Sequence, residues 1–97
     1  MIRHVVVFTW TAEATQDQKE RVAAELSRLP AIVPTLRAYH LGHDLGLDEG
    51  NFDFAVAADF DDADGYLAYR DHPDHRAIIT EFIRPITASR AAVQYEY

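Results

Sequence analysis

The segment Ile2–Thr11 constrains the fold most strongly, because it is apolar on both of its faces. Its residues other than Arg3 are β-branched or aromatic and show no helical period, which predicts a β-strand. Side chains alternate between the two faces of a strand, so a sheet with one solvated face should show a clear apolar–polar alternation. This strand lacks that alternation. Both of its faces therefore need a cover.

The rest of the chain predicts a fixed order of helices and strands. Thr15 and Gln18 have the spacing of a capping box ahead of an apolar helical stripe. Pro73 cannot lie inside a continuous helix but suits the first turn of a new one, so it divides the second helical region. We expect strands at residues 2–11, 35–44, 52–60 and 89–97, helices at 16–28, from 61 or 62 to 71 and from 73 onward, an irregular link containing Pro30 and Pro34, and a polar turn at 46–51.

This order predicts an α+β, ferredoxin-like β-α-β-β-α-β domain with a four-stranded antiparallel sheet and helices on one face. The opposite sheet face is left without a cover. The segment Phe52–Phe60 places Phe52, Phe54, Val56 and Phe60 on one face and the small Ala55 and Ala57 on the other. An uncovered face of that kind predicts a homodimer that forms through the sheet faces.

Composition narrows the class of protein. The 97 residues suit a single domain over residues 1–97, and the formal charge of −7 argues against a nucleic-acid partner. The chain has no cysteine, which excludes disulfides and thiol chemistry. The N-terminal apolar run is too short to span a membrane, so we expect no membrane association and a cytoplasmic location.

His75 is the first candidate for chemistry. It precedes Ile78, Ile79 and Phe82 at helical spacings, which predicts that its imidazole faces the core. Such a histidine is either structural or functional. In the structural alternative, His75 bonds backbone carbonyls at the helix junction and Tyr69 packs as an ordinary aromatic residue.

No metal site is predicted. His40 and His43 are three apart on a predicted strand and so face opposite sides of it. His72 and His75 have helical spacing, but no cysteine or fixed carboxylate completes a zinc site, and His72 suits a structural role at the helix start. The acidic run from Asp59 resembles a calcium loop only superficially, because its twelfth position is arginine.

Three segments together resemble the stress-responsive A/B barrel (Dabb, dimeric α/β-barrel) family. They are Ile2-Arg3-His4-Val5-Val6, Asn51-Phe52-Asp53-Phe54 and the Tyr-x-x-His-Pro-x-His run from Tyr69 to His75, and the ending Ser89–Tyr95 is also typical. The resemblance covers essentially the whole chain. It implies a ferredoxin-like monomer and a homodimer whose sheets meet face to face.

At its functional positions the chain is similar to the family's plant polyketide cyclase, which makes olivetolic acid. That likeness implies His75 as base, His4 as positioning or electrophilic partner and Tyr69 as oxyanion donor or substrate anchor, with no cofactor. The polyketide substrate does not carry over, because the first helix here has smaller residues. The implied substrate-binding residues are Val6, Phe8, Val22, Leu26, Ile78 and Ile79.

Two functions follow as hypotheses. The first is a cofactor-independent, polyketide-cyclase-like enzyme that closes a small carbonyl compound by an intramolecular aldol reaction. The second is a non-catalytic, stress-responsive homodimer that binds a small apolar ligand in the same pocket. Haem- or oxygen-dependent chemistry lacks support, because no iron-ligand set stands out. A void beside both histidines and Tyr69 would favour the enzyme.

Overall fold

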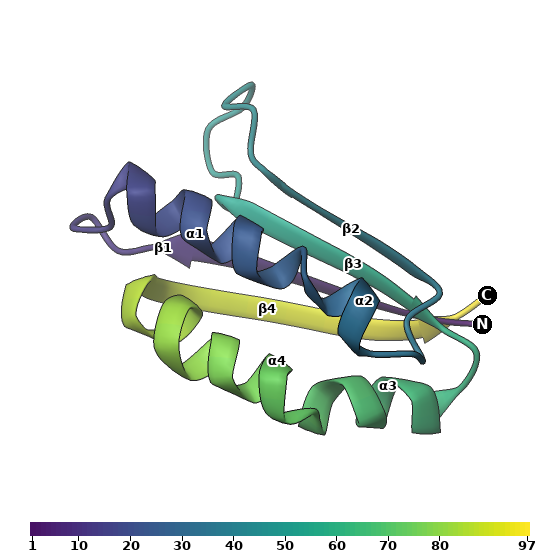
Figure 1. Cartoon of the computed structure of the whole chain (residues 1–97). Helices are drawn as coiled ribbons and strands as arrows, with labels where there is room; N and C mark the ends of the chain where they lie inside the picture. Colours follow the sequence, from purple (N-terminus) through teal and green to yellow (C-terminus); the bar gives the residue numbers. More distant parts are fainter.

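The computed structural model describes residues 1–97 and contains a four-stranded antiparallel sheet with helices on one face (Figure 1). The predicted ferredoxin-like fold is therefore confirmed. The strands are β1 (Ile2–Trp10), β2 (Ala38–His43), β3 (Phe54–Phe60) and β4 (Thr87–Glu96). The helices are α1 (Gln16–Leu26), α2 (Leu29–Ile32), α3 (Ala63–Asp71) and α4 (Pro73–Ile78), followed by a π-helical segment at Ile79–Ile83 and a 3₁₀ turn at Arg84–Ile86.

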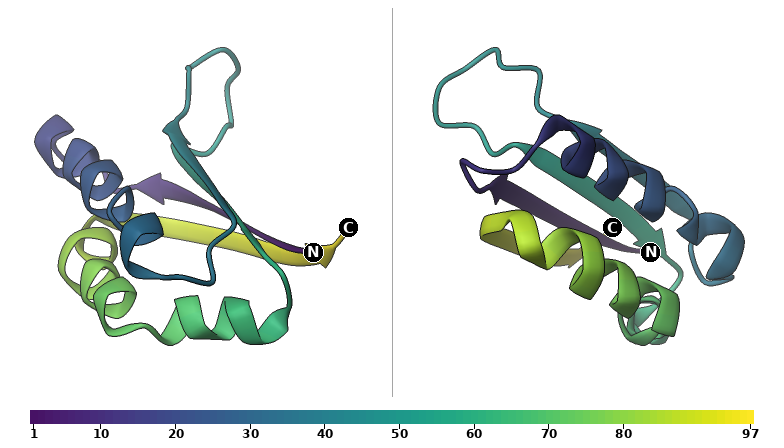
Figure 2. Two further views of the ribbon diagram at one scale, coloured as in Figure 1. Left: turned by 45° about the vertical axis from the view of Figure 1, so that its right-hand side comes forward. Right: turned by 60° about the vertical axis from the view of Figure 1, so that its left-hand side comes forward.

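Strand β1 lies inside the sheet, between β3 and β4, in the order β2-β3-β1-β4. Its register pairs His4 with Ala58 of β3 and with Gln94 of β4. The even-numbered residues of β1 from His4 to Trp10 are buried under the helices, whereas the odd-numbered ones face the open side and are partly exposed. Figure 2 shows that the helices all lie on one side of the sheet.

The predicted start signals of the helices are confirmed. Thr15 and Gln18 form a complete capping box at α1. The Asp62 carboxylate caps α3 by accepting a hydrogen bond from the Gly65 N–H at 2.8 Å. At the Pro73 break, His72 Nδ1 accepts from the Asp74 N–H at 3.1 Å, so a new helix begins where the proline requires it. His72 thus has the structural role expected of it.

Several boundaries differ from the prediction: β2 begins at Ala38 instead of Thr35, and α1 ends at Leu26 instead of Arg28. The link around Pro30 contains the short helix α2, because a proline in the first turn costs no hydrogen bond. Strand β3 begins at Phe54 instead of Phe52, since the Asp53 carboxylate accepts the Trp10 N–H at 2.8 Å as the chain enters the sheet. Strand β4 begins at Thr87, two residues before Ser89, and pairs there with Trp10.

The core lies between the sheet and the helices. Trp10 belongs to it and stacks on Phe8 with ring centroids 5.6 Å apart, so this residue is a core anchor. Helices α1 and α4 contribute the fully buried Val22 and the buried Ile78. None of the helices is long and apolar enough to cross a membrane.

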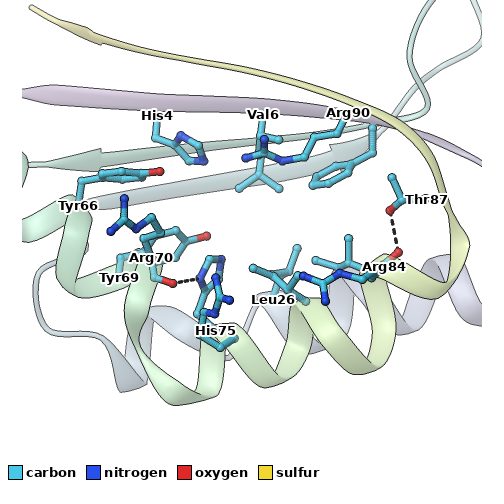
Figure 3. A pocket seen from close by; sticks show the side chains of 15 residues that line it. His4, Val6, Leu26, Tyr66, Tyr69, Arg70, His75, Arg84, Thr87 and Arg90 are labelled. Atoms are coloured by element: carbon cyan, nitrogen blue, oxygen red, sulfur yellow. Dashed lines mark hydrogen bonds between the residues drawn. The ribbon is translucent and has the colours of Figure 1, made fainter.

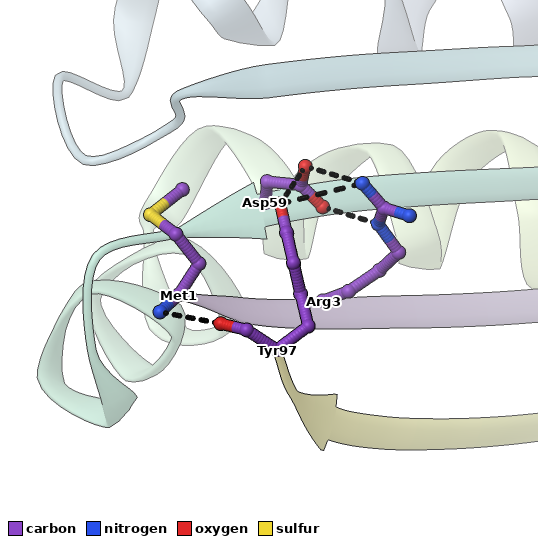
Figure 4. A network of polar contacts seen from close by, with 4 residues as sticks. All are labelled: Met1, Arg3, Asp59 and Tyr97. Carbon is purple, nitrogen blue, oxygen red and sulfur yellow. Dashed lines mark hydrogen bonds and ion pairs between the residues drawn. The ribbon is translucent and has the colours of Figure 1, made fainter.

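The two ends of the chain meet on the open face of the sheet, in a network around Asp59 (Figure 4). Arg3 donates from Nε and Nη2 to the two Asp59 oxygens at 2.7 and 2.9 Å, and the Tyr97 hydroxyl donates to the same carboxylate at 2.6 Å. The Arg3 guanidinium lowers the pKa of Asp59 to about 2. The Met1 amino group also donates to the Tyr97 carbonyl. These contacts join the start of β1 to the end of β4.

Two phenylalanines near the ends of β3 give a matched test of this packing. Phe60 is 0% exposed and contacts the Tyr66 and Tyr69 rings, whereas Phe52 is 37% exposed. We expect Phe60→Ala to lower the free energy of unfolding by about 3–5 kcal/mol, because it leaves a cavity in the core. Phe52→Ala should cost less than about 1 kcal/mol. Urea denaturation checks both values. Equal losses of stability would contradict the placement of Phe60 in the core and Phe52 at the surface.

Candidate functional site

A cavity of about 380 Å³ lies between the sheet and the helices, with side chains of both layers directed into it (Figure 3). The sheet contributes His4, Val6, Phe8, Val56 and Arg90. The opposite wall, from α3, α4 and the segment after them, contributes Tyr66, Tyr69, Arg70, His75, Arg76 and Ile79. Leu26, Ile83, Arg84 and Thr87 complete the lining.

His4 enters this cavity because its parity in β1 directs it toward the helices. It is 4% exposed, and its Nδ1 lies 2.7 Å from the Gln94 side-chain nitrogen on the neighbouring strand. An amide nitrogen only donates, so Nδ1 accepts and the proton of the neutral ring lies on Nε2. Burial lowers the pKa of His4 to about 4, and the charge of Arg90 adds to this effect. His4 is therefore a neutral ring with a free Nε2–H donor at neutral pH.

His75 carries the opposite tautomer. Its Nδ1 lies 3.0 Å from the Arg70 carbonyl oxygen, one of the groups left unpaired where α3 ends. A carbonyl only accepts, so Nδ1 carries the proton and Nε2 keeps its lone pair. Burial also lowers the pKa of His75. This is the carbonyl bond that the structural alternative predicted, and it leaves the second nitrogen free to act as a base.

Tyr69 lies against His75, with ring centroids 4.1 Å apart, and its hydroxyl lies 2.9 Å from the Tyr39 hydroxyl. Burial raises the pKa of Tyr69 strongly and raises that of Tyr39 to about 12. Both phenols therefore stay protonated. When Tyr39 donates to Tyr69, the Tyr69 proton remains available as a hydrogen-bond donor.

The structure brings His4, Tyr69 and His75 to one cavity, together with four of the six apolar residues named from the sequence: Val6, Phe8, Leu26 and Ile79. The other two, Val22 and Ile78, lie in the core and do not line the cavity. Ile78 and Ile79 are adjacent on a helix, where successive side chains point about 100° apart. Ile79 therefore lines the cavity while Ile78 packs into the core.

Sequence reasoning missed several polar residues of the lining. Tyr66 is three residues before Tyr69 on the same helix, a spacing that predicts a shared face and could have identified it. Its ring lies 5.0 Å from that of His4. Arg84 and Arg90 come from a turn and from a strand, and no sequence pattern links either to the histidines. No group of three or more metal-ligating side chains gathers in the structure.

The comparisons agree with the predicted family. The model of the stress responsive A/B barrel domain (Dabb) matches residues 2–97, and the chain belongs to this family. A dimeric ferredoxin-like protein of unknown function from Thermobifida fusca is 52% identical, with a TM-score of 0.92 over 99% of this chain and 90% of that one. No protein with a curated description matches the chain.

Two more distant structures share the fold alone. The hydroxynitrile lyase from Passiflora edulis is 23% identical, with a TM-score of 0.84 over 97% of this chain and 90% of that one. A Dabb family protein from Mesorhizobium loti is 22% identical, with a TM-score of 0.82 over 99% and 95% of the two chains. The likeness to the plant polyketide cyclase stays a prediction.

The buried His4 predicts a pH-dependent stability. Its pKa is about 4 in the folded chain against an ordinary 6.5, so between these values the unfolded chain binds more protons. The free energy of unfolding should therefore fall as the pH drops from 6.5 toward 4, by about 3 kcal/mol from His4. His75 adds a loss of the same sign. Urea denaturation between pH 4.5 and 7 measures the slope.

The control for this measurement is a pair of histidine variants. His4→Asn should flatten the slope, while His43→Asn, at an exposed strand end, should leave it unchanged. A slope that His4→Asn does not alter would contradict the buried, neutral state of His4.

Proposed function

We propose that the protein is a cofactor-independent acid–base catalyst that removes a proton next to a carbonyl group. The reaction class is aldol-type cyclisation or cleavage of a small carbonyl compound. One observation carries the proposal. The two buried histidines border one cavity in opposite tautomers, so His75 offers a lone pair and His4 offers an N–H donor. A base and a donor facing one cavity suit enolate chemistry.

The mechanism follows from these groups. His75 Nε2 takes the proton from the carbon beside the carbonyl, and the C–H electron pair forms the enolate. His4 Nε2–H and the Tyr69 hydroxyl donate to the oxygen that gains charge. The enolate carbon then attacks a second carbonyl of the same molecule, and the proton on His75 passes to the new alkoxide. Tyr39 orients the Tyr69 hydroxyl at 2.9 Å.

The size and lining of the cavity support a small substrate. A volume of about 380 Å³ is near the lower end for ligand sites. The apolar side chains Val6, Phe8, Leu26 and Ile79 give the cavity an apolar surface for the carbon skeleton of a substrate. A hydroxynitrile lyase shares the fold, so this scaffold can hold lyase chemistry.

The same apolar lining favours a second candidate, the non-catalytic binding of a small apolar ligand by a stress-responsive homodimer. In that function the histidines only orient the ligand through hydrogen bonds. Proton exchange on a bound ketone separates the two functions, because only the enzyme accelerates it.

We also propose that two copies assemble through the open sheet face. The solved relatives from Thermobifida fusca and Bacteroides fragilis are described as dimeric. On this chain the partly exposed Val5 and Val7 and the small Ala55 and Ala57 line a groove on that face, which the loop with the exposed Leu45 and Leu47 borders. A second sheet can approach closely over such small side chains.

Deuterium exchange into the methyl group of acetophenone tests the catalytic proposal. The protein in D₂O should accelerate the exchange, and His75→Ala should lower the catalysed rate by about 100-fold or more, since it removes the base. Tyr69→Phe should lower it about 10-fold or more, because it removes an oxyanion donor. NMR spectroscopy measures the loss of the methyl signal.

The matched control is His43→Ala, which removes an exposed histidine outside the cavity and should exchange like the wild type. The contrary outcome is that acetophenone shifts the NMR resonances of the cavity residues while its methyl protons exchange no faster than without protein. In that case the catalytic proposal fails and the binding function takes its place.

Light scattering after size-exclusion chromatography tests the assembly. We expect twice the mass of one chain for the wild type. Val93→Asp puts a charge on the open face, at a residue that is 55% exposed and pairs with Val5, and should yield monomers. Leu67→Asp, at a residue 39% exposed on α3, is the control and should stay dimeric. Monomeric wild type would exclude this interface.

A further inference from the structure

The basic side chains of this acidic protein are distributed unevenly. The chain has 9 lysines and arginines and a net charge of −7. Five arginines form ion pairs with carboxylates: Arg3, Arg21, Arg28, Arg37 and Arg70. Of the four remaining basic residues, three line the cavity, namely Arg76, Arg84 and Arg90. The fourth is Lys19. No aspartate or glutamate lines the cavity.

Arg84 and Arg90 line the same cavity from opposite walls. Arg90 is paired with Phe8 in the register of the sheet and extends along the sheet wall, while Arg84 extends along the helix wall opposite (Figure 3). The backbone that carries Arg84 is held in place, since Pro85 lies in its 3₁₀ turn and the Thr87 hydroxyl donates to the Ile83 carbonyl at 2.7 Å. Tyr66 and Tyr69 lie at the other end of the view.

Without a counter-charge, these guanidinium groups lower the stability of the folded protein. Like charges that share a cavity repel, and the positive charge of Arg90 also disfavours protonation of both histidines. An anion between Arg84 and Arg90 would remove the repulsion, and a guanidinium binds a carboxylate through paired hydrogen bonds.

We propose that the cavity takes a small oxo carboxylate, whose carboxylate binds Arg84 and Arg90 while its carbonyl faces His4, His75 and Tyr69. This inference rests on the proposed function and names the substrate class of the same site. The carbon chain between the two polar groups lies on the apolar middle of the cavity, against Val6, Phe8 and Leu26. The two polar ends fix the direction in which the ligand binds.

Calorimetry with two probes of the same shape tests this. The probe 4-acetylbenzoate carries a ketone and a carboxylate, and 4-acetylbenzamide replaces the carboxylate by a neutral amide. At low salt the wild-type protein should bind the acid about 10-fold or more tightly than the amide, since charge-assisted hydrogen bonds are the stronger ones. Raising the salt concentration should weaken binding of the acid alone.

Three charge-removing variants locate the effect. Arg84→Gln and Arg90→Gln should each weaken binding of the acid by about 10-fold. Both variants should bind the amide as tightly as the wild type, and this unchanged affinity also shows that they are folded. Lys19→Gln removes one unpaired charge outside the cavity and should change neither affinity. In NMR titrations, the acid and not the amide should raise the pKa of His4, because a nearby anion favours the imidazolium.

Three outcomes would overturn the inference. The first is equal affinity for the acid and the amide, and the second is an affinity for the acid that Lys19→Gln lowers as much as Arg90→Gln does. The third is no binding of either probe at millimolar concentration. The outcome is independent of the acetophenone exchange assay, because acetophenone has no carboxylate. Tight, arginine-dependent binding of the acid without proton exchange keeps the anion site and removes the catalytic proposal. Catalysed proton exchange without tighter binding of 4-acetylbenzoate keeps the catalytic proposal and removes the anion site.

Discussion

The register of β1 is the constraint on which the rest of the structure depends. This strand pairs with β3 on one side and β4 on the other, and its side chains alternate between the helix layer and the open face. A shift of one residue would move His4 to the open face and Arg3 into the core. The Asp59 network opposes such a shift, because Arg3 reaches its carboxylate only in this register. One alternation thus fixes both the core and the cavity.

The break at Pro73 has a similar effect on the opposite wall. The proline ends α3 and begins α4, so carbonyls at the end of α3 lose their helical partners. His75 bonds one of them, that of Arg70, and this bond sets its tautomer. A local rule of helix geometry therefore determines which nitrogen of His75 carries the proton and which keeps its lone pair. The structural bond at Nδ1 leaves Nε2 outside this bond, since the imidazole has two distinct nitrogens.

Much of the fold could be predicted from the sequence, because short-range signals specify it. The capping residues Thr15 and Asp62 begin helices where expected. The missed details depend on contacts between distant segments, as at β3, where Asp53 contacts Trp10 before the strand begins. The π-helical turn at Ile79–Ile83 had no sequence signal.

The sequence by itself determined the order of the elements, the helix break and the three polar residues His4, Tyr69 and His75, since periodicity, capping and a family motif are local properties. Only the tertiary structure decided that these three border one cavity and that their hydrogen bonds give the histidines opposite tautomers. It alone also brought Arg84 and Arg90 to the same space. Arg84 precedes β4 and Arg90 lies within it, and both line the cavity because β4 pairs with β1 in the sheet that the helices cover, a pairing that no spacing along the chain encodes.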